Sequence, residues 1–306
     1  MIPTSYHPGF AADIGPHIMP MRKFSLVAGE LATKKWADLI APAPVSYQEL
    51  LLVHDSSYLA AIQTGEPRPL AESQKFPWSP ALWPSVLLTN GGVIAAARSA
   101  LQTGIGAALA SGFHHSHQKQ GEGFCTFNGL VLAGEILRRE NRIQTLAVLD
   151  MDLHYGNGTA LLAANRPWLR QLSIYGNDYW ENVAYRDVSI VHHLDGDNHR
   201  SVPLPAGTDW LALKKIMEEN IPWLLDEIRP DLLLYQAGAD YLRDDPYSPL
   251  DLDHAALLER DRLVFRLAHE RAIPLAWTLA GGYSPELEKI VRVHTNTFLA
   301  AQEIHG

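Results

Sequence analysis

The chain has very little cysteine, no long apolar run and no concentration of positive charge. Cys125 is its only cysteine, which excludes an intramolecular disulfide and any zinc site built from cysteines. No apolar run approaches the ~20 residues of a membrane-spanning helix, and the N-terminus lacks the charged and apolar regions of a secretory signal. The 25 Lys and Arg residues against 34 Asp and Glu residues form no basic run interleaved with aromatics. We therefore expect a cytoplasmic protein that acts neither in a membrane nor on nucleic acid.

The composition is that of an ordinary globular protein. Of the 306 residues, 47% are hydrophobic and 19% are charged, which is enough apolar material for a large buried core. No low-complexity segment, internal repeat or Gly/Ser-rich linker divides the chain. We therefore expect a single domain over residues 1–306.

Short apolar runs alternate with longer helical patterns. The runs predict buried parallel strands at 106–111, 145–150, 171–176, 231–238 and 273–282. Helical spacing of apolar residues predicts helices at 90–101, 127–140, 208–228 and 251–272. Strands that alternate with helices indicate an α/β fold with a mainly parallel sheet covered on both faces, a three-layer αβα domain.

Unusual polar clusters follow four of the five predicted strands. Ligands collect at the carboxyl ends of the strands in such sheets, so these clusters are candidates for one shared site. The segment "LAVLDMDLHYGNG" places Asp150, Asp152 and His154 at every second position, which is one face of a strand. Asp152 and His154 carry ligand atoms that suit zinc or another divalent ion. The alternative is an aspartate that caps the following turn beside a histidine with ordinary partners.

The segment "SGFHHSH" supplies two adjacent histidines, His114 and His115. Adjacent histidines often lie on protein surfaces, but these two follow an apolar strand and a glycine. A neutral imidazole near a metal is a natural general base, and Asp150 is a candidate to tune it. We expect His117 to be a solvated loop residue.

Two further strand ends carry candidate residues. Asp240, in "QAGADYLRDDP", would provide a third metal ligand or cap a helix, whereas Asp244 and Asp245 are expected to be surface charges. Tyr283, in "TLAGGYS", would either pack in a tight turn or donate its hydroxyl to a developing oxyanion.

Two other features are expected to have no catalytic role. Cys125 has no base of its own and is expected to be a small buried residue. The segment "HHLDGDNHR" at 192–200 is rich in potential ligands, but it lies in a polar stretch that predicts a strandless surface loop.

Taken together, these segments resemble the histone deacetylase family, within the arginase–deacetylase fold. "GFHHSHQKQGEGFCTFNG", "LDMDLHYGNG", "QAGAD" and "AGGY" are similar to four motifs of that family and occur in the same order. "YHPGFAADIGPHIMPMRKF", "VHDSSYLAAI" and "FPWSPAL" extend the resemblance over most of the chain. "HYGNG" and "GEGFC" are most similar to the class IV branch and its bacterial relatives. Tyr155 stands where that branch usually has Gln, and Asn157 stands where class I enzymes have the Asp that pairs with the second histidine.

The resemblance implies a role for each candidate. Asp152, His154 and Asp240 would bind the metal, for which we expect zinc, although ferrous iron also suits this donor set. The general acid and base roles would be shared by His114, held by Asp150, and His115, held more weakly by Asn157. Tyr283 would donate to the oxyanion.

The resemblance also implies a substrate channel and a second ion. Gly123 and Phe124 would line the channel for an acyl-lysine stem, with Tyr179 or Trp180 on the opposite wall. A structural potassium ion would be bound by the backbone of Asp150, Asp152 and His154 together with Ser173.

The implied function is zinc-dependent removal of acetyl or longer acyl groups from N-acyl-lysine in proteins or peptides. An alternative keeps the site but changes the substrate to a small acetylated amine, such as an acetylpolyamine. A binding module without catalysis is a third alternative, against which the intact set of catalytic residues argues. A ureohydrolase is less favoured, because the paired motifs of a binuclear manganese site do not both occur.

Overall fold

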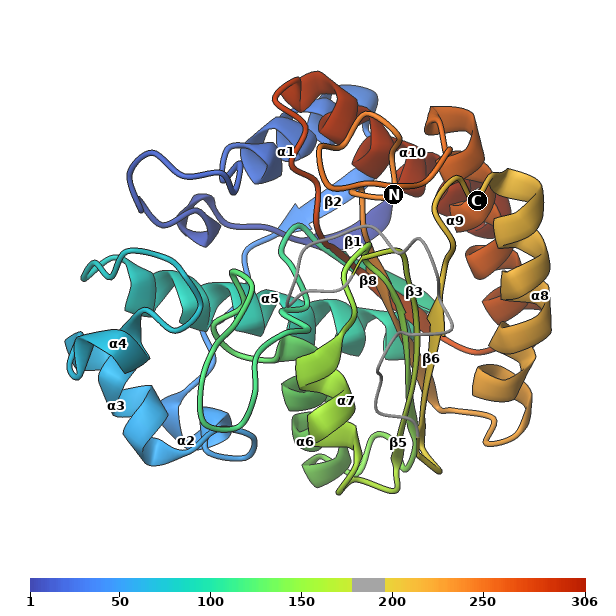
Figure 1. Ribbon diagram of the computed structural model, residues 1–306. Helices are drawn as coiled ribbons and strands as arrows, with labels where there is room; N and C mark the ends of the chain where they lie inside the picture. The colour runs from blue at the N-terminus through green and yellow to red at the C-terminus, as the bar shows by residue number, and fades with distance from the viewer. Residues whose placement is uncertain (178–195) are drawn as a thin grey trace.

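The computed structural model of the protein describes residues 1–177 and 196–306. Within these two ranges, eight strands form one sheet in the order β2-β1-β3-β8-β7-β4-β5-β6. All seven pairs of neighbouring strands in the described ranges are parallel. Helices cover both faces of the sheet (Figure 1). The predicted α/β architecture is therefore confirmed.

The five predicted strands are all present, with ends shifted by one to three residues. Three further strands were not predicted, namely β1, β2 and β6, and each has only four or five residues. The prediction of a strandless loop at 192–200 is wrong at its end, because β6 begins at His199 and this histidine is buried. Residues 192–195 lie outside the described ranges. The strands are β1 Ile2–Ser5, β2 Ala37–Ile40, β3 Ile105–Ala108, β4 Leu146–Met151, β5 Leu169–Tyr175, β6 His199–Pro203, β7 Leu232–Ala237 and β8 Leu275–Leu279.

Seven of the helices in the described ranges form the two outer layers. Helices α5, α6 and α7 lie against one face of the sheet, and α1, α8, α9 and α10 lie against the other (Figure 1). Three short helices, α2 to α4, extend beyond α5. The helices are η1 Pro8–Phe10, α1 Lys23–Lys34, α2 Tyr47–Leu50, α3 Ser56–Thr64, α4 Arg68–Ala71, α5 Leu82–Thr103, α6 Gly129–Arg139, α7 Asn157–Ala163, α8 Trp210–Asp226, α9 His254–Glu270 and α10 Leu287–His305.

Polar side chains define where three of the predicted helices begin. The side chains of Asn128, Asp209 and Asp253 accept hydrogen bonds from backbone N–H groups three residues further on, in α6, α8 and α9. Such bonds satisfy N–H groups that have no partner within the helix. Asp209 is thus the cap of the helix predicted at 208–228.

The strand register brings the polar clusters together. Asp150 of β4 lies opposite Gln236 of β7, and Ala237 of β7 lies opposite both Met151 and Leu279. The chain therefore leaves β4, β7 and β8 at the same level of the sheet. Since β3 is the other neighbour of β8, all four clusters that follow these strands reach one edge.

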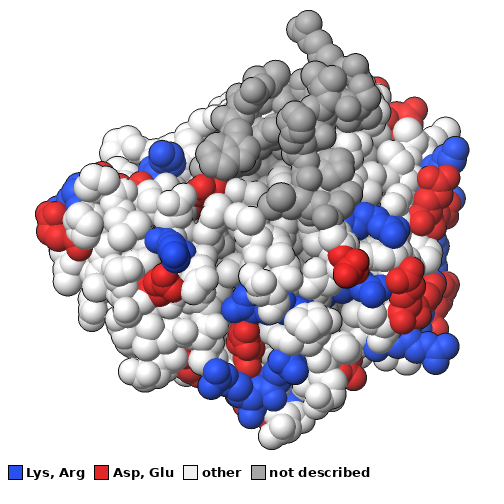
Figure 2. Space-filling view, turned by 60° about the horizontal axis from the view of Figure 1, so that its bottom comes forward, with Lys and Arg blue, Asp and Glu red and all other residues white. Residues whose placement is uncertain are grey.

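Charged side chains lie mainly on the outside of the layers. On the face shown in Figure 2, acidic and basic side chains lie beside one another mainly along the right side and the bottom of the view. Exposed ion pairs such as Arg262–Glu303 and Arg271–Asp226 are of this kind. No helix in the described ranges combines the length and the apolar character needed to cross a bilayer. The cellular compartment stays a prediction.

Trp277 of β8, the largest fully buried side chain among the described residues, tests how strongly the sheet depends on its core. Its ring packs edge-to-face against Phe265 of α9 and Phe298 of α10, with centroids 5.2 and 4.8 Å away. We expect Trp277→Ala to lower the free energy of unfolding by about 3–5 kcal/mol, because a large cavity replaces these contacts. Denaturant titration measures the change. Leu211→Ala, at a side chain that is 74% exposed, should change it by less than about 0.5 kcal/mol.

Candidate active site

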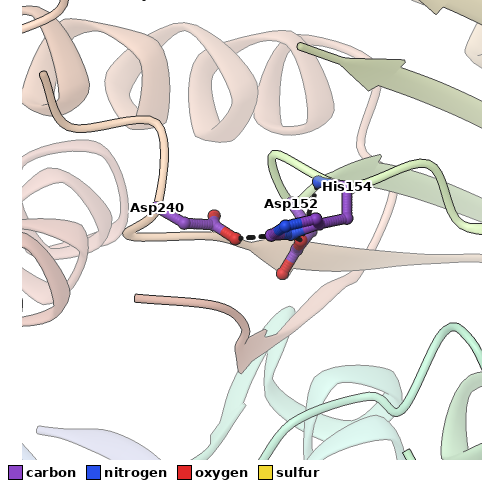
Figure 3. A group of neighbouring side chains, drawn as sticks. All are labelled: Asp152, His154 and Asp240. Atoms are coloured by element: carbon purple, nitrogen blue, oxygen red, sulfur yellow. Dashed lines mark hydrogen bonds and ion pairs between the residues drawn. The ribbon is translucent and has the colours of Figure 1, made fainter. Parts of the chain in front are cut away.

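Asp152, His154 and Asp240 converge at the shared edge of the sheet (Figure 3). Asp152 and His154 follow β4, and Asp240 follows β7. The Nδ1 atom of His154 lies 3.1 Å from Asp152 Oδ1 and 3.3 Å from Asp240 Oδ2. All three side chains are buried, and their ligand atoms lie within 4.8 Å of one another. The three residues that the sequence suggested as metal ligands are therefore brought together.

Backbone groups of neighbouring strand ends orient the two carboxylates. The N–H of Gly281, after β8, donates to Asp152 Oδ2 at 2.6 Å, and the N–H of Leu153, after β4, donates to Asp240 Oδ1 at 3.1 Å. A Cβ on residue 281 would lie 1.9 Å from Asp240 Oδ2, so only glycine allows this approach. Each carboxylate is thus held by the loop of a different strand.

The chemistry of this cluster fits a divalent cation. Asp240 Oδ2 is buried, and apart from its 3.3 Å ion pair with His154 Nδ1 it accepts no hydrogen bond from the described residues. Burial alone would lower the pKa of His154, but Asp152 and Asp240 raise it to about 10, which shows how strongly the two carboxylates favour a positive charge here. Two carboxylates and one imidazole are suitable ligands for zinc and for ferrous iron.

The adjacent histidines have different partners and opposite electrostatics. His114 Nδ1 lies 2.7 Å from Asp150 Oδ2, and His115 Nδ1 lies 2.6 Å from Asn157 Oδ1. Burial lowers the pKa of both rings, but the carboxylates of Asp150 and Asp152 outweigh burial at His114 and raise its pKa. At His115, burial and the nearby His114 hold the pKa well below its usual range. The pair therefore combines a ring that favours its charged form with one that favours its neutral form.

Tyr283 borders the three candidate ligands Asp152, His154 and Asp240, called the ligand cluster below. Its ring centroid lies 5.9 Å from that of His154. Burial, followed by the charges of Asp152 and Asp240, raises the pKa of its hydroxyl well above the usual value. The hydroxyl therefore stays protonated and can donate a hydrogen bond.

Asp245 was expected on the surface, and this prediction is wrong. Asp245 is only 4% exposed. Its carboxylate accepts hydrogen bonds from the backbone N–H groups of Tyr283, at 2.6 Å, and Tyr247, at 3.1 Å. Burial raises its pKa to about 6. No local signal in "RDDP" separates it from Asp244, which does lie at the surface and pairs with Lys289. Asp245 thus holds the turn that presents Tyr283.

Two cavities that share lining residues border the cluster. The outer one is lined by Lys75, His115, Gly123, Phe124, His154, Tyr247 and Tyr283. The inner one shares Gly123, Phe124 and Tyr283 with it and continues between apolar side chains that include Ile14, Met21, Phe24, Leu82 and Val86. Tyr247 was not predicted from the sequence, because the tight turn formed by Asp245 was not recognised. Tyr179, the predicted opposite wall, lies outside the described residues.

Tyr155 faces a small cluster of its own. Its ring packs against Tyr175, with centroids 4.9 Å apart, and its hydroxyl lies 3.0 Å from Nε2 of the buried His199. The tyrosine at this position therefore connects the loop after β4 to β5 and β6.

Two other predicted residues lie as follows. Cys125 is buried, and burial raises the pKa of its thiol, which agrees with an inert core residue. Ser173 of β5 lies opposite Asp150 of β4, and its hydroxyl accepts a hydrogen bond from the N–H of Gly156. The potassium ion implied at this place stays a prediction.

The α/β fold carries, at one edge of its sheet, a buried cluster that suits a divalent metal ion, and sequence comparison identifies the family. The histone deacetylase domain matches residues 17–298. The chain belongs to the histone deacetylase family, as its motifs suggested, and is a deacetylase that acts on amides.

Similar proteins occur in several organisms. An uncharacterized protein of Picosynechococcus sp. is 30% identical over 99% of both chains. Histone deacetylase 2 of Arabidopsis thaliana is 28% identical over 88% of this chain and 68% of its own length. A probable deacetylase of Methanothermobacter thermautotrophicus is 26% identical over 81% of this chain and 74% of its own.

Solved structures share the fold. An acetylpolyamine aminohydrolase from Burkholderia pseudomallei superposes with a TM-score of 0.81 at 18% identity, over 99% of both chains. The HDA15 HD domain gives a TM-score of 0.81 at 19% identity, over 99% of this chain and 95% of that one.

The proposed ligand set can be tested by metal analysis. We expect Asp240→Ala to lower the affinity for zinc at least about tenfold, because it removes one of the three ligands, a buried carboxylate that the N–H of Leu153 orients. Titration against a chromophoric chelator measures the affinity. Asp244→Ala, four residues further on at the surface, should bind zinc like the wild type. Equal affinity of both variants would contradict the ligand assignment.

Proposed function

We propose that the protein removes acyl groups from the side chain of N-acyl-lysine in proteins or peptides, and that residues 1–306 form one catalytic domain. The observation that carries this proposal is the outer cavity, which leads from the surface to the ligand cluster between Phe124 and Tyr247. Its described lining contains Lys75 and no acidic residue. A polyamine carries further positive charges that would approach Lys75, whereas the methylene stem of lysine is uncharged. The lining therefore favours the lysine substrate.

The inner cavity is the proposed place of the acyl group. It begins at Gly123, Phe124 and Tyr283 and extends between apolar side chains. An amide carbonyl placed at the ligand cluster would direct its amine side into the outer cavity and its acyl side into the inner one. The apolar lining favours a hydrocarbon chain, so acyl groups longer than acetyl are candidate substrates.

The electrostatics support a division of roles between the histidines. His115 would act as the general base, because its low pKa keeps the ring neutral. Its Nδ1 is hydrogen-bonded to Asn157. Nε2 would therefore be the nitrogen that takes the proton of the attacking water. The same nitrogen would return the proton to the leaving lysine amine. His114, whose pKa is raised beside Asp150, would hold a positive charge next to the reacting carbonyl.

The remaining groups would stabilise charge on the substrate. A divalent ion bound by Asp152, His154 and Asp240 would supply Lewis-acid polarisation of the carbonyl and of the attacking water. The hydroxyl of Tyr283 would donate a hydrogen bond to the oxygen of the carbonyl as it becomes negative. The hydrogen bond from its N–H to Asp245 fixes the turn from which this hydroxyl is presented.

Turnover of matched substrates tests the proposed substrate class. Zinc-loaded protein should show a higher kcat/KM on acetyl-lysine and longer acyl-lysine peptides than on acetylpolyamines. Lys75→Glu should raise kcat/KM for acetylpolyamines at low salt, because it replaces a repelling charge by an attracting one, while Lys119→Glu should not. A preference of the wild type for acetylpolyamines would support the small-amine alternative. No turnover of any acylated amine would contradict the enzymatic function.

A Tyr283→Phe variant tests the oxyanion donor. We expect its kcat to fall roughly 10²–10³-fold, because one preorganised hydrogen bond to the transition state is lost. KM and zinc affinity should change little. Tyr47→Phe, which removes the hydroxyl of a tyrosine distant from the ligand cluster, is the control. A fully active Tyr283→Phe enzyme would exclude the proposed role.

A further inference from the structure

The buried carboxylate of Glu122 lies behind His115, and one side chain, Asn157, separates the two. Glu122 precedes Gly123 of the cavity lining and is only 5% exposed. Its Oε2 accepts a hydrogen bond at 2.7 Å from Nδ2 of Asn157, whose Oδ1 lies 2.6 Å from Nδ1 of His115. Glu122, Asn157 and His115 thus form a continuous hydrogen-bonded chain.

The chemistry of an amide fixes the direction of this chain. An ionised carboxylate only accepts hydrogen bonds, so it requires the NH₂ group of Asn157 on its side. The oxygen of the same amide must then face His115, and it can only accept. His115 must therefore carry its proton on Nδ1, which leaves Nε2 as the basic nitrogen. The orientation of the amide and the tautomer of the imidazole both follow from the charge on Glu122.

Other contacts keep Glu122 in place and ionised. Its Oε1 accepts from Gln120 Nε2 at 2.9 Å, and His117 Nε2 lies 3.1 Å from Oε2. Burial raises the pKa of the carboxyl, but the hydrogen bonds from His117 and Asn157 outweigh burial and bring the pKa below its usual value. His117, expected to be a solvated loop residue, is in fact half-buried and belongs to this network.

We propose that Glu122 is a positioning residue that acts through Asn157 to hold His115 in the Nδ1-protonated tautomer and to strengthen Nε2 as a base. This inference rests on the proposed function, in which His115 is the base. His114 contacts the carboxylate of Asp150 directly, whereas His115 is separated from its carboxylate by one neutral amide. The intervening amide transmits orientation and polarisation without placing a full charge against the ring.

Kinetics of Glu122→Gln distinguish this role from a purely structural one. A positioned base contributes about 10²–10⁴-fold, so a partial loss of its polarisation should lower kcat about tenfold with KM nearly unchanged. Glu135→Gln is the matched control, since the half-buried carboxylate of Glu135 is also held by a specific partner, Arg166, but lies away from the histidines. Unchanged kcat in Glu122→Gln would overturn the proposal.

A reciprocal exchange of the two side chains provides the sharper test. Asn157→Asp alone should also lose activity, because it places a second carboxylate at hydrogen-bond distance from Glu122. In the double variant Glu122→Gln/Asn157→Asp, the new amide can donate to the new carboxylate, which then accepts directly from His115. We expect kcat of the double variant to exceed that of either single variant. Losses that simply multiply would overturn the proposal.

Imidazole ¹⁵N NMR of the zinc-loaded protein provides a measurement that needs no turnover. His115, assigned by the signal missing in His115→Gln, should show the pattern of a single Nδ1-protonated ring. Glu122→Gln should lose that pattern, because glutamine can present either end of its amide to Asn157. An unchanged pattern would overturn the proposal. If the wild type failed to turn over any acylated amine, the proposed function would fail while this measurement would still decide the role of Glu122.

Discussion

The concentration of buried carboxylates at the ends of β4 and β7 is the constraint on which the rest of the site depends. Four aspartates are buried there, Asp150, Asp152, Asp240 and Asp245. Their mutual repulsion in a poorly solvated interior must be offset by donors and by positive charge. Backbone N–H groups of the loops after β4 and β8 provide the donors, and they also fix the direction of each carboxylate.

Two buried cations of the outer helices hold the loops of this cluster. Lys23 adds positive charge near the aspartates, whereas Arg260 forms an ion pair with its neighbour Asp261. Lys23 at the start of α1 donates to the carbonyl of Ala280 at 2.6 Å, and Arg260 of α9 donates to the carbonyl of Gly238 at 2.7 Å. Burial lowers the pKa of Lys23 to about 8, even though Asp240 and the other nearby carboxylates oppose the shift. These two contacts attach the loops after β8 and β7 to the helical layer, so the outer helices contribute directly to the geometry of the ligand cluster.

Much of the fold and of the site could be predicted because the relevant signals are local. Buried parallel strands appear as continuous apolar runs, and the residues that follow them gather at one edge of the sheet. The short strands β1, β2 and β6 carry no such run. The edge strands β2 and β6 are only partly buried, and β1, which lies inside the sheet, has only four residues. Asp245 was wrongly predicted to lie on the surface. One of its partners, the N–H of Tyr247, reaches it only because of a tight turn, and the other, the N–H of Tyr283, lies 38 residues further along the chain.

The sequence by itself determined the fold class, the family and the three residues suited to bind a metal, because these depend on residue type, spacing and order along the chain. Only the tertiary structure decided which groups surround each of them. It placed Asp150 against His114 and the Glu122–Asn157 pair against His115, and so gave two adjacent histidines opposite pKa shifts. The physical reason is that hydrogen bonding and charge in a buried site act over a few ångströms in space, whatever the separation of the partners in sequence.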